Sequence, residues 1–373
     1  MKTLTLCAAV TGFHLLAQSA SAAELPERIE SIEHKTAHCF SAPPAVNCEV
    51  SAVVRTGESL ILANDKPVPD REGAAVFTLA FAEGQLSGLP SYLPGKALKQ
   101  ADKFEALTTT LDGRYVIAST AFNKAGTEQN PRADVLNTLV YWPANAPQSA
   151  KVLSLSSRAG VSSSMTLRKQ IGEAVGSPYF QIEGISMAPS EPGMTSRADE
   201  QLILGIRKHG NSSADSAFGF LLISAHVKFD DGELRLVDSF KTIKRLELSA
   251  SGHVLGLSGI EYDRYNQDRL YAVTSFEQAS VDDKGSKVDE IGGFLWVLPF
   301  TEGKPGEPRL VHRADGKALM FSNKPEGVEV LDARHILVVH DDDRVEVQTS
   351  EAGIKRGNSE FAYSEITMPP MNP

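Results

Sequence analysis

The feature that most constrains this chain is a short sequence phrase that returns roughly every 55–80 residues. Each copy has an acidic or small residue, then Gly or Ala, then an aliphatic residue. After a polar spacer comes an aliphatic run that ends in polar side chains. The clear copies begin at Glu105, Glu183, Ser258 and Glu326, and a fainter one covers residues 49–53. Self-similarity at a nearly constant period predicts a repeat architecture.

The residues around each phrase predict four short strands per unit. In the second unit these are 107–111, 115–120, 136–142 and 150–155, with the turn pair Asp112-Gly113 between the first two. Antiparallel four-stranded units repeated around an axis form a β-propeller. We therefore predict an all-β chain with a single propeller domain over residues 24–373, built from five blades of four antiparallel strands. Six blades are the alternative, if residues 28–39 contribute more than a closing strand.

One segment departs from the strand pattern. Over residues 164–175, the apolar side chains of Leu167, Ile171 and Val175 recur every fourth position. This spacing places them on one face of a helix. We predict one short inserted helix between the second and third units.

The N-terminal residues predict export. Residues 1–23 have a positive start at Lys2, an apolar run and small residues before the expected cleavage site, as a signal peptide does. Beyond this segment Cys39 and Cys48 remain, and two cysteines in an exported chain favour a disulfide. We expect a periplasmic or secreted monomer, with no membrane span because no later segment approaches ~18 uninterrupted apolar residues.

The charge balance limits the partners. The formal net charge of −10 argues against a nucleic-acid backbone as ligand. Carboxylates gathered at one place could instead hold a cation.

The repeat also predicts where such a place would be. The first strand of each propeller blade lines the central channel, so Glu105, Glu183 and Glu326 should lie near one channel mouth. The second strands should end at the same face and add Asp65 and Asp341. Several oxygens that converge on an axis are the ligands of a hard cation, Ca²⁺ before Mg²⁺. These five residues are the predicted metal ligands.

Other residues at this mouth carry further predicted roles. Arg207 and Lys208 would bind an anionic group of a substrate, and His340 beside Asp341 would manage protons in catalysis. A structural interpretation stays open beside this one. The glutamates could accept backbone hydrogen bonds or pair with arginine and lysine, while the glycines allow close approach of the chains.

Two of the phrases carry a resemblance. Residues 181–185 with 202–207, and residues 324–328 with 338–342, are similar to phrases of exported bacterial β-propellers of the esterase-like phytase or phytase-like group, and of a related propeller family of unknown function. The resemblance implies a propeller with a polar, acidic channel mouth and calcium-dependent hydrolysis of phosphoesters or esters.

Two functions from different classes follow. The first is a metal-dependent phosphoesterase or esterase that acts on a small anionic or ester substrate at the channel mouth. The alternative is a non-catalytic propeller that binds a protein, a glycan or an envelope component. Convergence of the acidic side chains within ~5 Å of a common point would favour the first.

Overall fold

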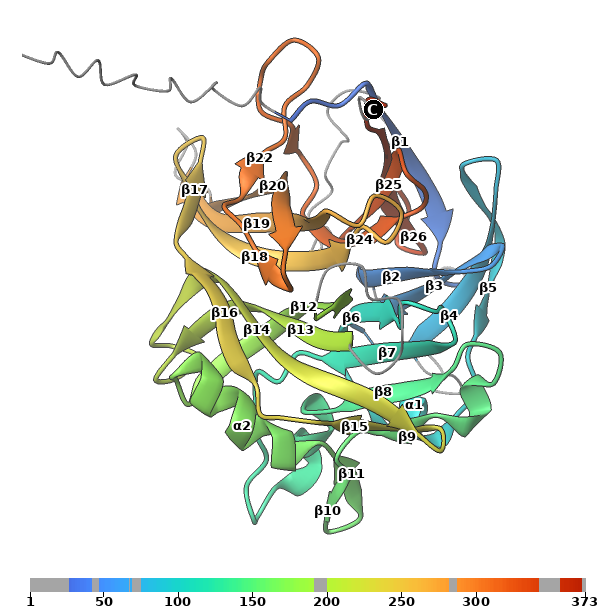
Figure 1. Ribbon diagram of the computed structural model, residues 1–373, viewed down its shortest axis with the longest axis vertical. Coiled ribbons are helices and arrows are strands. Elements are labelled where there is room, and N and C mark those ends of the chain that lie inside the picture. The colour runs from blue at the N-terminus through green and yellow to red at the C-terminus, as the bar shows by residue number, and fades with distance from the viewer. Residues whose placement is uncertain are drawn as a thin grey trace, which may run out of the picture.

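The computed structural model describes residues 27–41, 47–66, 68, 75–190, 200–281, 287–341 and 356–370. Antiparallel sheets stand side by side around the middle of the molecule (Figure 1). The all-β, β-propeller-like fold is therefore confirmed. The predicted signal peptide lies outside the described residues. No helix in the described ranges is long and apolar enough to cross a membrane.

Five inner strands contact one another in a closed ring around the axis. They are β2 (Val50–Thr56), β6 (Phe104–Thr109), β12 (Tyr179–Pro189), β18 (His253–Tyr262) and β24 (Pro325–Val330). Each inner strand contains one of the repeated phrases, so the repeat marks the axis of the fold.

Each inner strand pairs antiparallel with the next strand in sequence, and that strand with a third. The second strands are β3 (Ser59–Asn64), β7 (Tyr115–Thr120), β13 (Glu200–Gly210), β19 (Arg269–Val281) and β25 (His335–His340). The third strands are β4 (Val76–Ala82), β8 (Leu139–Pro143), β14 (Ser216–Asp230), β20 (Lys287–Thr301) and β26 (Glu360–Thr367).

The outer positions are less regular than the predicted fourth strands. The first two sheets end in β5 (Gln85–Tyr92) and β9 (Lys151–Val152). In the third sheet both β15 (Glu233–Leu236) and β16 (Lys241–Leu246) pair with β14. In the fourth, three short pieces pair with β20: β21 (Lys304–Pro305), β22 (Arg309–Leu310) and β23 (Met320–Phe321). Strand β17 (Leu248–Ala250) pairs with the start of β18, and β10 (Ser156–Arg158) forms a hairpin with β11 (Val161–Ser163).

The last sheet is closed by the N-terminal part of the chain. Strand β1 (Ser31–His38) pairs antiparallel with β26 over its whole length. The stretch 28–39 thus supplies the closing strand. For this unit the sequence predicts a third strand at 344–349 and a fourth at 362–368. The first of these lies outside the described residues, and the second is found as β26, the third strand of the sheet.

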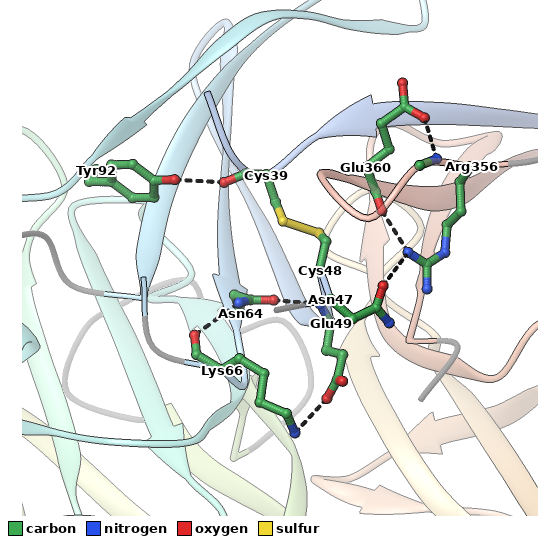
Figure 2. The surroundings of a disulfide bond; sticks show 10 residues. Cys39, Asn47, Cys48, Glu49, Asn64, Lys66, Tyr92, Arg356 and Glu360 are labelled. Atoms are coloured by element: carbon green, nitrogen blue, oxygen red, sulfur yellow. Dashed lines mark hydrogen bonds and ion pairs between the residues drawn. A yellow bond between two sulfur atoms is a disulfide. The ribbon is translucent and has the colours of Figure 1, made fainter. Parts of the chain in front are cut away.

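The predicted disulfide is confirmed and strengthens this closure. Cys39 follows β1 and Cys48 precedes β2, and their sulfur atoms are 2.07 Å apart. The bond therefore links the outermost strand of the last sheet to the innermost strand of the first (Figure 2). The Tyr92 hydroxyl donates a hydrogen bond of 2.8 Å to the carbonyl of Cys39.

The hydrophobic core is divided into clusters that each lie between two neighbouring sheets. One sheet face packs against the preceding sheet and the other against the following one, so β6 is buried along its whole length and does not alternate. The predicted helix is confirmed as α2 (Met165–Val175), which buries Leu167, Ile171 and Val175. Helix α1 (Lys96–Gln100) and the 3₁₀ turns Pro131–Leu136 and Pro147–Ser149 are short connections.

The glycines of the phrase allow the inner strands to meet. A Cβ atom on Gly259 would lie 2.5 Å from the Glu326 carbonyl oxygen, and one on Gly327 would lie 3.0 Å from the Cα of Ala52. Real Cβ atoms do not approach backbone this closely. Part of the repeated phrase therefore serves packing.

Candidate functional site

The inner strands all begin at one end of the axis, which we call the amino-terminal mouth. The predicted ring is found there: Glu105, Glu183 and Glu326 are buried, with 4%, 3% and 2% exposure, and line a cavity of about 10 Å³ on the axis. This volume holds about one water molecule. The mouth is thus a packed cluster of charges, and a substrate would have to bind above it.

One half of this cluster is built on the first two sheets and contains lysines that sequence reasoning missed. Lys103, just before β6, lies 2.5 Å from Glu105 and 3.0 Å from Asp65. Lys66 lies 2.6 Å from Glu49 and 3.2 Å from Asp65. Both lysines are about one-third exposed, whereas the three carboxylates are buried. The cations thus form the outer layer of this half.

Glu49 is fixed by its neighbours along the chain. Its backbone N–H donates to Asn64 Oδ1 at 2.6 Å, and Asn64 Nδ2 donates to the Lys66 carbonyl at 2.9 Å (Figure 2). Cys48, the preceding residue, is anchored by the disulfide. The disulfide and the asparagine therefore place the Glu49 carboxylate beside the end of β3.

Three carboxylates converge where the first and last sheets meet. One oxygen from each of Glu49, Asp65 and Asp341 lies within 4.8 Å of the other two, and all three residues are buried. Ca²⁺ takes oxygen ligands at about 2.3–2.6 Å, so ligands on opposite sides of one ion are about 5 Å apart. The donor type and the spacing fit a hard cation, which would share the space with the Lys66 ammonium.

The other half of the cluster is built on the last three sheets around Arg207. Its Nη1 donates to Glu326 at 3.1 Å and to the Ser258 hydroxyl at 3.0 Å, while Nη2 lies 2.7 Å from Glu277. Lys324 contacts the same two carboxylates, Glu326 at 2.9 Å and Glu277 at 3.1 Å, and lies 3.9 Å from Asp341. Lys324 therefore connects this half to the three converging carboxylates.

The protonation of the cluster follows from burial. Burial, and then the charges of Glu105 and Glu326, raises the pKa of Glu183 well above its usual range, and the Gln181 amide donates to its carboxyl group. Burial also raises the pKa of Glu105 to about 7, although Lys103 opposes the shift. Burial disfavours the charged form of Glu277 too, but Arg207 and Lys324 lower its pKa to about 2. Among these three groups, Glu105 and Glu183 are therefore the ones that hold a proton more readily than an ordinary glutamate.

His340 lies apart from this arrangement. Its Nε2 is 2.7 Å from the Ser364 hydroxyl, which is also 2.8 Å from His34 Nδ1. The ring centroid lies 5.3 Å from that of Phe321, and burial lowers the pKa of His340 to about 3. The imidazole is thus a neutral group inside the last sheet, and its role in proton transfer stays a prediction.

The structure brings together Glu105, Glu183, Glu326, Asp65, Asp341 and Arg207. It adds residues that were not singled out from the sequence: Glu49, Lys66, Lys103, Glu277 and Lys324. The repeat contained a signal for three of them, since Glu49, Lys103 and Lys324 each stand two residues before the first axial position of a unit. Glu277 has no such signal, because its strand is longer than its counterparts in the first two sheets and in the last.

Comparisons with known proteins leave the function open. No protein family model matches the chain, and no curated protein matches it. Among solved structures, it is similar to a glycosyl hydrolase from Bacteroides ovatus with 7% identity and a TM-score of 0.43, covering 91% of this chain and 96% of that one. It is also similar to a gluconolactonase from Xanthomonas campestris with 8% identity, a TM-score of 0.39 and coverage of 92% and 95%.

A member of the DUF4221 family from Bacteroides vulgatus is similar as well, with 8% identity, a TM-score of 0.39 and coverage of 93% and 99%. Similarities this distant carry no argument about activity. The β-propeller-like architecture therefore rests on the sheets themselves, and the resemblance to phytase-like propellers stays a prediction.

Proposed function

We propose that this protein is an exported, cation-dependent hydrolase of phosphomonoesters or esters whose site lies at the amino-terminal mouth. The observation that carries the proposal is the convergence of Glu49, Asp65 and Asp341 within 4.8 Å. The confirmed disulfide is compatible with an exported protein.

The proposed cation site differs from the one expected from the sequence, because it lies beside the axis. The sequence assigned it to Glu105, Glu183 and Glu326 together with Asp65 and Asp341. Glu105 is already paired with Lys103 at 2.5 Å, and Glu326 with both Arg207 and Lys324. Glu49, Asp65 and Asp341 would hold the ion, with Lys66 as the more exposed partner that gives way.

The chain's own residues would divide the remaining work. A hard cation supplies a Lewis acid that polarises a phosphoryl or ester oxygen and acidifies a water molecule. Arg207, Lys208 and Lys324 would bind the anionic part of the substrate. Glu105, with a pKa of about 7, is placed to accept or return a proton near neutral pH.

Calorimetry with Ca²⁺ tests the cation site, and hydrolysis of p-nitrophenyl phosphate and p-nitrophenyl acetate tests the activity. Glu49→Gln should lose Ca²⁺ binding and hydrolysis together, because it removes one of three ligands. Glu173→Gln on α2 is the matched control. The Glu173 side chain is 67% exposed and is not one of the three converging carboxylates. A wild-type protein that binds no Ca²⁺ and cleaves neither substrate would rule the proposal out.

One observation favours the non-catalytic alternative. The axial glutamates Glu105 and Glu326 are neutralised by cations of the chain itself. A binding protein could also use the cavity of about 660 Å³ between the first and last sheets, which is lined by Arg55, Phe81 and His335 among others. This alternative predicts that Ca²⁺ has no effect on the protein.

A further inference from the structure

Glu277 occupies an unusual place among the carboxylates of the amino-terminal mouth. It lies on β19, beyond the residues that pair with the inner strand β18. Its side chain is 37% exposed. One of its oxygens, Oε1, lies 2.7 Å from Arg207 Nη2 and 3.1 Å from Lys324 Nζ. A partly exposed carboxylate thus bridges two cations that are themselves buried.

Contacts with residues other than Glu277 also hold the two cations in place. Arg207 is 3% exposed, and its Nη1 is fixed by Glu326 and Ser258, which in turn lies 2.6 Å from the Ser275 hydroxyl. Lys324 is 7% exposed and contacts Glu326 at 2.9 Å. Among the described residues, Glu277 and Glu326 each contact both cations, and Glu277 is the more exposed of the two carboxylates.

A third cation, Lys208, lies close enough to this pair for the charges of Arg207 and Lys324 to act on it. The Lys208 ammonium lies 4.5 Å from the centre of the Phe218 ring, and the Arg207 guanidinium lies 5.3 Å from the same ring. Lys208 forms no ion pair with any residue that the structure describes. Burial, followed by the charge of Arg207, lowers the pKa of Lys208, so the site gains from an added negative charge.

We propose that Arg207, Lys208 and Lys324 form a binding site for a phosphoryl group, and that Glu277 is a tethered stand-in which the phosphoryl group of a ligand displaces. A phosphoryl group offers more oxygens and more charge than one carboxylate, so it can satisfy all three cations. The inference deepens the proposed function, because it assigns phosphomonoesters in preference to neutral esters. The site then admits a ligand only if that ligand displaces the Glu277 carboxylate from Arg207 and Lys324.

Titration with inorganic phosphate in EDTA tests this site without any cation. Binding is followed by calorimetry at low ionic strength and pH 7. Glu277→Gln should bind phosphate at least ~10-fold more tightly than the wild type, because the charged competitor is gone. Glu173→Gln removes one exposed carboxylate elsewhere and should leave phosphate affinity unchanged. Adding Lys208→Gln to Glu277→Gln should abolish most of the gain.

Two further measurements keep the test decisive. Glu277→Asp retains the charge but shortens the side chain, and should bind phosphate with an affinity between those of the wild type and Glu277→Gln. Phosphate should raise the melting temperature of Glu277→Gln more than that of Glu173→Gln. Equal phosphate affinities in these two variants would overturn the site, and acetate binding as tight as phosphate would overturn the phosphoryl assignment. Phosphate binding without Ca²⁺-dependent hydrolysis would leave this site standing and reject the proposed hydrolase.

Discussion

The two ends of the inner strands both bury glutamates, yet they are built differently. At the amino-terminal mouth, carboxylates and cations of all five sheets form a connected cluster. At the opposite end, the carboxyl-terminal mouth, Glu261 and Glu329 are buried beside Arg264, and the backbone N–H and charge of Arg55 also stabilise Glu329. Arg264 lies 2.8 Å from Glu261 and donates to the Thr109 hydroxyl at 2.7 Å.

The difference lies in how the carboxylates are satisfied. At the carboxyl-terminal mouth, Glu261 also accepts from the Thr108 hydroxyl at 3.3 Å, and the Ser186 hydroxyl, which bonds to Glu261 as well, accepts the Tyr262 N–H at 2.9 Å. Hydroxyls of the neighbouring inner strands and the Arg264 guanidinium thus satisfy the Glu261 carboxylate. At the amino-terminal mouth, three carboxylates of separate strands converge, and the cations nearest to Glu49 and Asp65 are partly exposed lysines.

The comparison teaches that a buried glutamate on the axis is not by itself a functional residue. The repeat places acidic side chains at both ends of the inner strands, three residues apart in the case of Glu326 and Glu329. Among the described residues, the converging oxygens lie at the amino-terminal mouth, next to two partly exposed lysines. The following tests separate the two ends.

The largest effect is expected from Arg264→Met at the carboxyl-terminal mouth. It leaves Glu261 buried without its ion-pair partner and Glu329 with Arg55 as its remaining nearby cation, which costs about 3–5 kcal/mol of unfolding free energy at pH 8. At pH 5 the loss should be smaller, because burial raises the pKa of Glu261 to about 7 and both carboxyls can be neutral. Urea denaturation at the two pH values measures this difference.

Arg235→Met is the matched control for that experiment. Its guanidinium is 60% exposed and lies 3.8 Å from Asp230, and an exposed pair contributes at most about 1 kcal/mol. Calcium affinity should be unchanged in both variants. A loss of Ca²⁺ binding in Arg264→Met would mean that the two mouths are not independent.

Gly259→Ala should disturb the contact between the inner strands β18 and β24 at the axis. The added Cβ would lie 2.5 Å from the Glu326 carbonyl oxygen, and backbone cannot move aside cheaply at the axis. We expect a loss of about 3 kcal/mol in unfolding free energy, measured by thermal or urea denaturation. In Gly357→Ala the nearest atom is Glu360 Oε2 at 3.5 Å, so that variant should stay within about 1 kcal/mol of the wild type.

The sequence predicted the fold well because the repeat encodes it directly. The phrase positions gave the inner strands, and the fourfold spacing of Leu167, Ile171 and Val175 gave the helix. The outer strands were less predictable, since β15, β16 and the pieces along β20 are short and carry little apolar pattern. That β1 closes the last sheet depends on pairing between distant residues, such as Ser31 with Thr367, which local sequence does not specify.

The site was predictable in its carboxylates and less so in its cations. Glu105, Glu183 and Glu326 follow from the repeat. Lys103 and Lys324 stand two residues before two of these glutamates, but their pairing with Asp65 and Glu277 joins neighbouring sheets and is not specified by the local sequence. Which three carboxylates converge depends on the seam between the first and last sheets, where Glu49 and Asp65 meet Asp341. That contact exists only once the ring is closed.

The disulfide should stabilise the amino-terminal mouth more than the other end. Replacing Cys39 and Cys48 together by alanine should cost about 2–3 kcal/mol, since the bond closes a short loop. Glu49 follows Cys48 directly, so calcium affinity should also fall. Hydrogen exchange should show faster exchange over residues 47–66 and unchanged exchange over residues 256–264. Equal changes in both regions would show that the bond supports the ring as a whole.

The smallest expected effect is a pH-dependent stabilisation by Ca²⁺. Burial places the pKa of Glu105 near 7 in the folded state, against about 4.3 for an unfolded glutamate, so the folded state holds more protons between these values. Stability should therefore fall as the pH rises from about 4.3 to 7, with the loss complete above that. Burial raises the pKa of Glu49 as well, so protons compete with Ca²⁺ for the converging carboxylates at low pH.

At pH 8 fewer protons compete for Glu49, and Ca²⁺ at ten times its dissociation constant should restore about 1.4 kcal/mol, with little effect at pH 5. Thermal melts with and without Ca²⁺ at both pH values measure this. Glu49→Gln should abolish the Ca²⁺-dependent shift, whereas Glu261→Gln should retain it, because Glu261 lies at the carboxyl-terminal mouth. If both variants lose the shift, the cation does not bind where Glu49, Asp65 and Asp341 converge, and the contrast between the two mouths would be structural alone.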